Sequence, residues 1–206
     1  MSEIKIIKTE VVYENKWLKM IKTRFLALHP EIPDTFRRST IGEYFHASRD
    51  GELGVSLNAV VICAIHIGED RVKRLVVTDE YRIPIQEREY GFPAGLIEKG
   101  MTVEETAVKE LKEETGLDVL QVYSNMTTPI MVSSAGMSNE GIKMVFLTCS
   151  GTTSKEFQEP IEDINTQLLD FDQICRLVRE PHVFSAKAYP MFYAMIFAGK
   201  IGFANF

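Results

Sequence analysis

The chain has 206 residues, of which 45% are hydrophobic and 25% charged, and its formal net charge is −6. This length suffices for one full core and a small appended domain, and the composition is ordinary for a soluble globular protein. A nucleic-acid-binding surface is basic, so the negative charge argues against nucleic acid as a partner. It does not argue against a small substrate that carries phosphate groups.

The sequence gives little indication of a signal peptide, a membrane-spanning segment or disulfide bonds. The first ten residues lack the apolar segment of a signal peptide, and no run approaches the ~20 apolar residues that span a bilayer. The three cysteines have no metal-ligand spacing, and their odd number argues against a disulfide framework. We therefore expect a cytoplasmic protein that does not interact with membranes.

The first 50 residues read as a small antiparallel sheet. Strands are expected at 11–13, 17–28 and 42–47, with a loop through Pro30, Pro33 and Asp34 between the last two. Three strands alone make a poor independent fold. We expect this domain, residues 1–50, to pack on the rest of the chain or on a second subunit.

The second predicted domain, residues 51–206, alternates strands and helices. Strands are expected at 57–67, 74–81, 117–123, 143–149 and 166–171, and helices at 171–179 and 185–198. A further helix follows Gly100 and is expected to end at Gly116, because glycine adopts the left-handed conformation of a helix C-terminus at low cost. This pattern predicts a mixed sheet flanked by helices.

The stretch from 91 to 117, GFPAGLIEKGMTVEETAVKELKEETGL, is the most informative part of the sequence. At about 100° per residue, Glu110, Glu113 and Glu114 lie at roughly 0°, 300° and 40° around the helix and form an acidic stripe. Ala107, Val108 and Leu111 form an apolar stripe beside it, which we expect to face the core.

Such a stripe is open to two interpretations. Acidic faces of amphipathic helices are mostly solvated surface, and i,i+4 Glu–Lys pairs support the helix alone. Alternatively, the stripe is a site for Mg²⁺, which prefers oxygen ligands and takes one or two carboxylates together with substrate phosphates. The glycines placed before and after the helix favour the metal site.

The same stretch resembles the signature box of the Nudix hydrolases. The matching positions are Gly95, Glu110, Leu111, Glu113, Glu114, Gly116 and Leu117. The resemblance implies an α+β fold, the Nudix α/β/α sandwich with a mixed sheet, preceded in this chain by the small N-terminal antiparallel β domain. It also implies Mg²⁺ as the cofactor, with Mn²⁺ as the alternative, held by Glu110, Glu113, Glu114 and the backbone carbonyl of Ala94.

Two positions depart from the family pattern. Met101 stands where the box has its first Glu, and Lys109 stands where it has Arg. In the family those two residues help to hold the loop against the helix. Packing of Met101 on the aliphatic part of Lys109 is a plausible substitute. The departures also motivate an alternative, a non-catalytic Nudix module that binds a nucleotide or a partner without cleaving it.

Within the family the chain is most similar to the ADP-sugar pyrophosphatases. This likeness implies hydrolysis of the diphosphate of ADP-ribose or a related nucleotide sugar to AMP and a sugar phosphate. It implies a homodimer, with Trp17 stacking on adenine and Arg82, Gly136 and Met137 contacting substrate. A mobile loop late in the chain brings the general base in these enzymes.

The register of that loop points to Glu162 as the base, with Glu159 as second choice and the box residue Glu113 as the remaining candidate. From the sequence alone, a core aromatic of the small sheet is the favoured interpretation of Trp17, and a loop acid such as Glu162 is normally a solvated residue.

Overall fold

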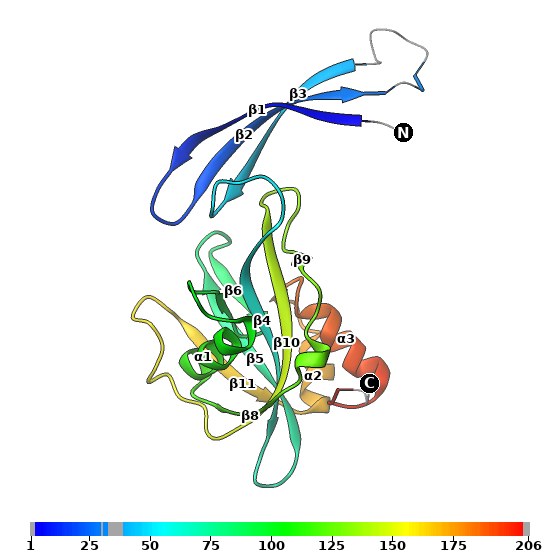
Figure 1. The fold of residues 1–206 in the computed structure, drawn as a ribbon. Coiled ribbons are helices and arrows are strands. Elements are labelled where there is room, and N and C mark those ends of the chain that lie inside the picture. Colours follow the sequence, from blue (N-terminus) through cyan, green and yellow to red (C-terminus); the bar gives the residue numbers. More distant parts are fainter. Residues whose placement is uncertain (1–2, 30, 33–38, 204–206) are drawn as a thin grey trace. The chain divides into compact units, whose positions relative to one another are not determined.

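The computed structural model describes residues 3–29, 31–32 and 39–203, and the chain divides into two compact units (Figure 1). The first unit contains the described residues up to Asn58 together with Val132–Gly141. The second contains Ala59–Met131 and the described residues from Ile142 onward. The segment 132–141, which follows the second unit's first helix in sequence, thus belongs structurally to the first unit.

The first unit is built on a three-stranded antiparallel sheet in the order β1-β2-β3. Its strands are β1 (Glu3–Glu14), β2 (Lys19–Leu28) and β3 (Ser39–Ser48). The three predicted strands are present; the first and third are longer than predicted, and the second begins two residues later. The predicted turn residues Pro30, Pro33 and Asp34 lie outside the described residues.

The segment 132–141 attaches to the outer side of β3. The backbone N–H of Ala47 donates to the carbonyl of Met137 at 2.8 Å, and the Tyr44 hydroxyl donates to the carbonyl of Gly136 at 2.8 Å. These bonds fix the loop on the sheet.

The second unit is organised around a mixed sheet whose main path runs β12-β6-β5-β4-β10-β8. Three further pairings lie off this path: β11 pairs with β5, β7 with β4 and β9 with β10. Strand β5 pairs antiparallel with β4, β6 and β11. The β4–β7 and β8–β10 pairs are also antiparallel, whereas β12 runs parallel to β6. The strands are β4 (Ser56–Ile67), β5 (Lys73–Arg82), β6 (Glu87–Gly91), β7 (Ala94–Leu96), β8 (Asp118–Val122), β9 (Met131–Val132), β10 (Glu140–Ser150), β11 (Ile164–Leu169) and β12 (Val183–Phe184).

Helices cover both faces of this sheet, as Figure 1 shows. They are α1 (Val103–Thr115), α2 (Phe171–Leu177) and α3 (Tyr189–Ala198), with a 3₁₀ turn η1 (Ser124–Met126). The predicted Nudix-like α/β/α sandwich with a mixed sheet is confirmed. Helix α3 starts four residues later than predicted, with Pro190 in its first turn, where a missing N–H costs nothing.

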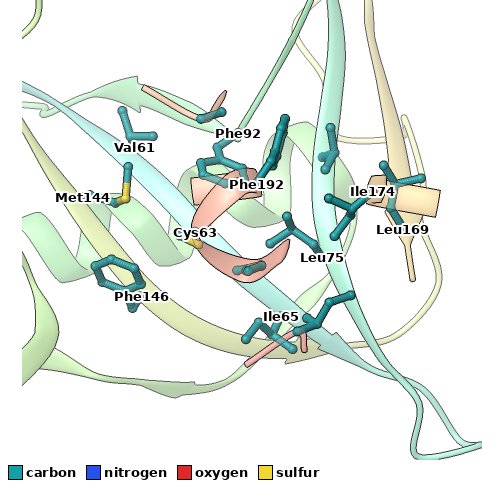
Figure 2. Packing of buried hydrophobic residues seen from close by; sticks show 14 of the residues in the cluster. Val61, Cys63, Ile65, Leu75, Phe92, Met144, Phe146, Leu169, Ile174 and Phe192 are labelled. Atoms are coloured by element: carbon teal, nitrogen blue, oxygen red, sulfur yellow. The ribbon is translucent and has the colours of Figure 1, made fainter. Parts of the chain in front are cut away.

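The central strand β4 is buried on both faces because its side chains alternate between two cores. Val61, Cys63 and Ile65 point into the cluster that includes Phe192 of α3 (Figure 2). Val60, Ile62 and Ala64 point the other way, into the cluster formed with α1. The continuous apolar run in the sequence therefore reflects a strand between two helical layers. In the described part of the chain, no helix is long and apolar enough to cross a membrane.

Candidate active site

Helix α1 is held in place at both ends. At its start, the Thr102 hydroxyl accepts from the Glu105 N–H and the Glu105 carboxylate accepts from the Thr102 N–H, which is a capping box. At its end, Gly116 has φ 76°, as predicted, and a Cβ there would lie 2.7 Å from the backbone nitrogen of Ser154. No other residue fits this position, so the helix stops where the next loop crosses it.

The buried face of α1 differs from the predicted one. Ala107 and Leu111 are fully buried, but Val108 is 41% exposed, so its assignment to the core stripe was wrong. The i, i+4, i+7 row from Ala107 through Leu111 continues instead to Glu114, which is only 6% exposed. The helix register thus carries a carboxylate into the position that an apolar side chain normally fills.

The strand before the helix is shaped to receive two of the carboxylates. The Ala94 N–H donates to Glu114 Oε2 at 3.2 Å. A Cβ at Gly95 would lie 2.0 Å from the carboxyl carbon of Glu110, so glycine allows that carboxylate to rest directly on the backbone. Glu110 and Glu114 therefore meet the Ala94–Gly95 backbone from neighbouring turns of one helix.

This cluster holds more negative charge than its surroundings compensate. Burial raises the pKa of Glu114 well above its ordinary value, and Glu80, Glu110 and Glu162 raise it further against the opposing Ala94 N–H. Burial likewise raises the pKa of Glu110, as do the charges of Glu113 and Glu162, while Lys109 lowers it. A bound cation would relieve this repulsion.

Lys109 joins the helix to the preceding loop. Its Nζ lies 2.6 Å from Glu113 Oε2, 3.1 Å from Glu98 Oε1 and 3.7 Å from Glu110 Oε1, and these partners raise its pKa. Glu98 thus supplies a loop carboxylate for residue 109 although position 101 is methionine. The Met101 N–H donates to the Glu98 carbonyl at 3.1 Å, which closes the turn between them.

No three metal-binding side chains form a complete cage among the residues that the structure describes. The donors nevertheless fit a hard divalent cation. Glu110 and Glu114 offer carboxylate oxygens beside a backbone cleared by Gly95, and Glu114 is buried without a cationic partner that offsets its charge. Glu113 is engaged by Lys109 instead, and the described contact of Ala94 is through its N–H.

Glu162 lies in the loop before β11 and near the acidic cluster. Its charge raises the pKa values of Glu80, Glu110 and Glu114, which places it electrostatically among them. Its carboxylate accepts from the Glu159 N–H at 2.9 Å, and its own N–H donates to the Glu159 carbonyl at 3.0 Å. Glu159 is not among the largest causes of those shifts.

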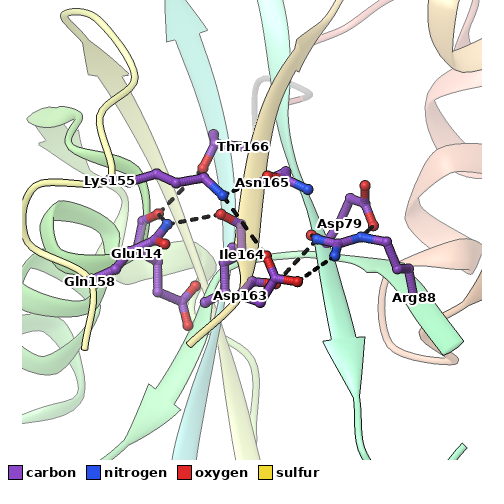
Figure 3. Close-up of polar contacts among 9 residues, drawn as sticks. All are labelled: Asp79, Arg88, Glu114, Lys155, Gln158, Asp163, Ile164, Asn165 and Thr166. Carbon is purple, nitrogen blue, oxygen red and sulfur yellow. Dashed lines mark hydrogen bonds and ion pairs between the residues drawn. The ribbon is translucent and has the colours of Figure 1, made fainter. Parts of the chain in front are cut away.

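This loop is tied to the end of α1, as Figure 3 shows. Gln158 Nε2 donates to the backbone carbonyls of Glu114 at 2.7 Å and Ile164 at 3.0 Å. The Thr166 hydroxyl donates to the same Glu114 carbonyl at 3.3 Å. The backbone of the most buried carboxylate and the loop that carries Glu162 are therefore parts of one hydrogen-bonded network.

Arg82 lies at the end of β5 between two carboxylates. Its NH1 is 2.9 Å from Glu80 Oε1, and its Nε is 3.2 Å from Glu89 Oε2. The guanidinium side chain is 46% exposed, so it is accessible to a ligand. This arrangement connects the predicted substrate residue to Glu80, a member of the acidic cluster.

The remaining predicted substrate residues, Trp17, Gly136 and Met137, lie in the first unit. Trp17 is 63% exposed at the turn between β1 and β2, which excludes the alternative that it is a core aromatic. Asn15 Oδ1 accepts from the N–H groups of Trp17 and Leu18 and shapes this turn. Met20 pairs with Ala47, which bonds to Met137, so the 134–138 loop meets the sheet at the end from which Trp17 projects.

Sequence reasoning missed two acidic members of the site. Glu80 is two residues from Arg82 on β5 and so shares its face, a signal that the alternation of the strand contains. Glu98 lies three residues before Met101, the position that differs from the family pattern, and nothing in that pattern identifies Glu98 as the partner of Lys109.

Comparisons with known proteins identify the family and the fold. The sequence pattern that defines the NUDIX domain matches residues 57–192, well over half of the chain. A crystal structure of an ADP compounds hydrolase superposes with a TM-score of 0.62 at 16% sequence identity, covering 93% of this chain and 91% of that one. At this identity the likeness shows the fold alone.

Curated relatives are also similar. A putative nudix hydrolase 2 of Caenorhabditis elegans is 26% identical over 78% of this chain, an ADP-ribose pyrophosphatase of Bacillus subtilis 29% over 60%, and an ADP-sugar pyrophosphatase of Mus musculus 25% over 71%. The matches span 67%, 66% and 62% of those proteins' own lengths, so about a third of each has no counterpart in the match. From the domain match and the box geometry together, the chain belongs to the Nudix family of hydrolases.

Proposed function

We propose that this enzyme hydrolyses the diphosphate bond of ADP-ribose or a related nucleotide sugar in a Mg²⁺-dependent reaction that releases AMP and a sugar phosphate. The observation that carries the proposal is the buried Glu114 carboxyl group, whose ionisation is opposed by burial and by the charges of Glu80, Glu110 and Glu162. A carboxylate buried there is costly unless a cation accompanies it, so an acidic residue at this position favours a cation in the working enzyme. The similarity to pyrophosphatases of ADP-ribose and ADP-sugars supports the substrate class.

The residues that would hold Mg²⁺, or Mn²⁺ in its place, are Glu110 and Glu114, with the Ala94 carbonyl and Glu113 completing the set. When bound, such an ion neutralises diphosphate charge and makes water a better nucleophile. Glu113 would have to leave Lys109, to which its carboxylate is bonded at 2.6 Å. Its exposed position makes that exchange less costly than moving the buried Glu114.

The other residues bind and orient the reacting groups. Arg82 would exchange its contacts with Glu80 and Glu89 for the anionic diphosphate, which a guanidinium binds through two N–H groups at once. A water molecule attacks one phosphorus, its proton passes to Glu162, and the bond from that phosphorus to the bridging oxygen breaks. Glu162 suits this role because its charge already acts on Glu110 and Glu114.

The first unit supports the proposal of a homodimer. An open pocket of about 470 Å³ on its sheet is lined mainly by apolar side chains, among them Ile4, Ile6, Phe25 and Leu53. Ile4 and Ile6 are each more than half exposed on a three-stranded sheet too small to bury them. A second copy would cover this surface, and the exposed Trp17 would then be available for stacking on a base.

A cytoplasmic location stays a proposal. It is supported by the three cysteines, all of which are free thiols, with Cys63 and Cys149 buried.

The proposed reaction predicts that hydrolysis of the nucleotide sugar depends on both the metal ion and Glu114. On a panel of nucleotide sugars, we expect the parent to release AMP from ADP-ribose with Mg²⁺ and to be inactive after EDTA treatment. Glu114→Gln should lose turnover by at least ~10²-fold, because it removes a charged ligand. Glu104→Gln, in the first turn of the same helix, is the control and should match the parent. Full activity of Glu114→Gln would contradict the metal assignment.

The two loop acids should differ in their effect on the chemical step. Glu162→Gln is expected to lower kcat by ~10²–10⁴ with little change in KM, as for loss of a general base. Glu159→Gln, on the same loop but not among the main causes of the pKa shifts in the acidic cluster, should cost far less. If steady-state kinetics gave the reverse order, Glu159 would be the base. If neither change slowed the reaction tenfold, Glu113 or the metal ions alone would activate the water.

The dimer proposal predicts a charge-sensitive association on one face of β1. The parent should elute as a dimer at micromolar concentration, and Ile6→Glu should shift it toward monomer, because a charge would be buried at the interface. Lys5→Glu, on the opposite face of the same strand, should remain dimeric. A fully active monomeric parent in size-exclusion chromatography with light scattering would rule the proposal out.

A further inference from the structure

A single arginine fixes the base of the loop that carries Glu162. Arg88, on β6, donates from Nε to Asp79 Oδ1 at 2.6 Å and from NH2 to the Asp79 carbonyl at 2.7 Å. From its other side, NH1 donates to Asp163 Oδ2 at 2.7 Å and NH2 to the Asp163 carbonyl at 3.2 Å. Figure 3 shows the guanidinium between these two residues.

Two of these four bonds hold Asp163, one through its side chain and one through its backbone carbonyl. Asp163 is also tied by the Tyr81 N–H, which donates to its carbonyl at 3.3 Å. Its side chain is 60% exposed, so burial does not fix it, and the ion pair with Arg88 lowers its pKa. Asp79 is only 13% exposed and provides the rigid side of the contact.

Asp163 is the residue directly after Glu162 and directly before β11. On its other side, the hydrogen bonds of Glu162 within the described part of the chain are those of its turn with Glu159. Gln158 anchors the loop further back, at the Glu114 carbonyl. Glu162 therefore lies in a short segment whose ends are fixed by Gln158 and by Asp163, and Asp163 is the adjacent one.

We propose that Arg88 is a positioning residue, which sets the reach of Glu162 toward the acidic cluster by bonding Asp163 to Asp79 of β5 and to β6. The contact of Arg88 with Asp79 and Asp163, called the clamp below, is present in the structure, whereas its use in catalysis rests on the proposed function. Among the described residues, Arg88 makes no hydrogen bond to Glu80, Glu110 or Glu114, although its charge lowers the pKa of Glu80, so its positioning effect passes through the backbone of 162–163. A misplacement of ~1 Å in a reacting group can cost ~10²-fold in rate.

Amide hydrogen exchange tests the clamp without any substrate. Arg88→Gln should speed exchange at the amides of Glu159, Glu162 and Tyr81, all of which bond within or to this loop base. Arg74→Gln is the matched control, since it removes another two-point Arg–carboxylate contact, with Asp70 on the β4–β5 hairpin. Arg74→Gln should leave those three amides unchanged. Unchanged exchange in Arg88→Gln would overturn the proposal.

A double-mutant cycle tests whether the clamp acts through Glu162. Arg88→Gln alone should lower kcat roughly 10–100-fold at nearly constant KM, but less than about twofold when Glu162 is already Gln, because there is no base left to position. Equal losses in both backgrounds would show a merely structural role and overturn the proposal. Asp163→Asn, which keeps an oxygen and the backbone carbonyl, should lose less than Arg88→Gln.

The outcomes separate this proposal from the proposed function. If Arg88→Gln does not fold, Arg88→Lys replaces it in both experiments. Lysine keeps the positive charge but cannot bond to Asp79 and Asp163 at once as a guanidinium does, so we expect the same changes in exchange and kcat, but smaller ones. If the parent hydrolyses no nucleotide sugar, the proposed function fails, and any substrate that it does turn over serves for the cycle. Faster exchange together with non-additive kcat losses is the result expected.

Discussion

The site depends on one buried carboxylate. Helix α1 presents positions 107, 111 and 114 to the same face, and packing of Ala107 and Leu111 forces position 114 into the core. Among the described residues, the Ala94 N–H donates to this carboxyl group, while burial and three neighbouring glutamates oppose its ionisation. An apolar residue at 114 would stabilise the fold better, since an uncompensated buried charge is costly. Its presence is understandable if the fold accepts that cost for a cation.

Several other features of the second unit follow from that constraint. Gly95 brings Glu110 against the strand backbone, and the capping box and Gly116 fix how far the helix can rotate or extend. The Glu114 carbonyl receives Gln158 and Thr166, so the same residue organises the cluster through its side chain and the following loop through its backbone. Helix position, loop position and site charge are therefore coupled.

Much of this organisation could be predicted from the sequence, because it is local. The glycine spacing and the three glutamates lie within 22 residues, and apolar runs mark the strands. Long-range contacts could not be read in the same way. Arg88 meets Asp163 across 75 residues, and Lys109 takes its loop carboxylate from Glu98 although position 101 lacks one. Val108 was misassigned because apolar character alone does not decide which side of a helix faces the core.

Proton release on Mg²⁺ binding tests the central claim most directly. Because burial holds the pKa of Glu114 well above 4.5, the metal-free folded protein keeps this proton at a pH where the unfolded chain has lost it, and its stability falls as pH rises through the shifted pKa. A divalent cation needs the carboxylate and must expel the proton. Calorimetric titration at about pH 6, in buffers of different ionisation enthalpy, should show proton release for the parent and for Glu104→Gln, and markedly less for Glu114→Gln. Equal proton release in all three proteins, or Mg²⁺ binding without any, would contradict a buried metal-binding carboxylate at position 114.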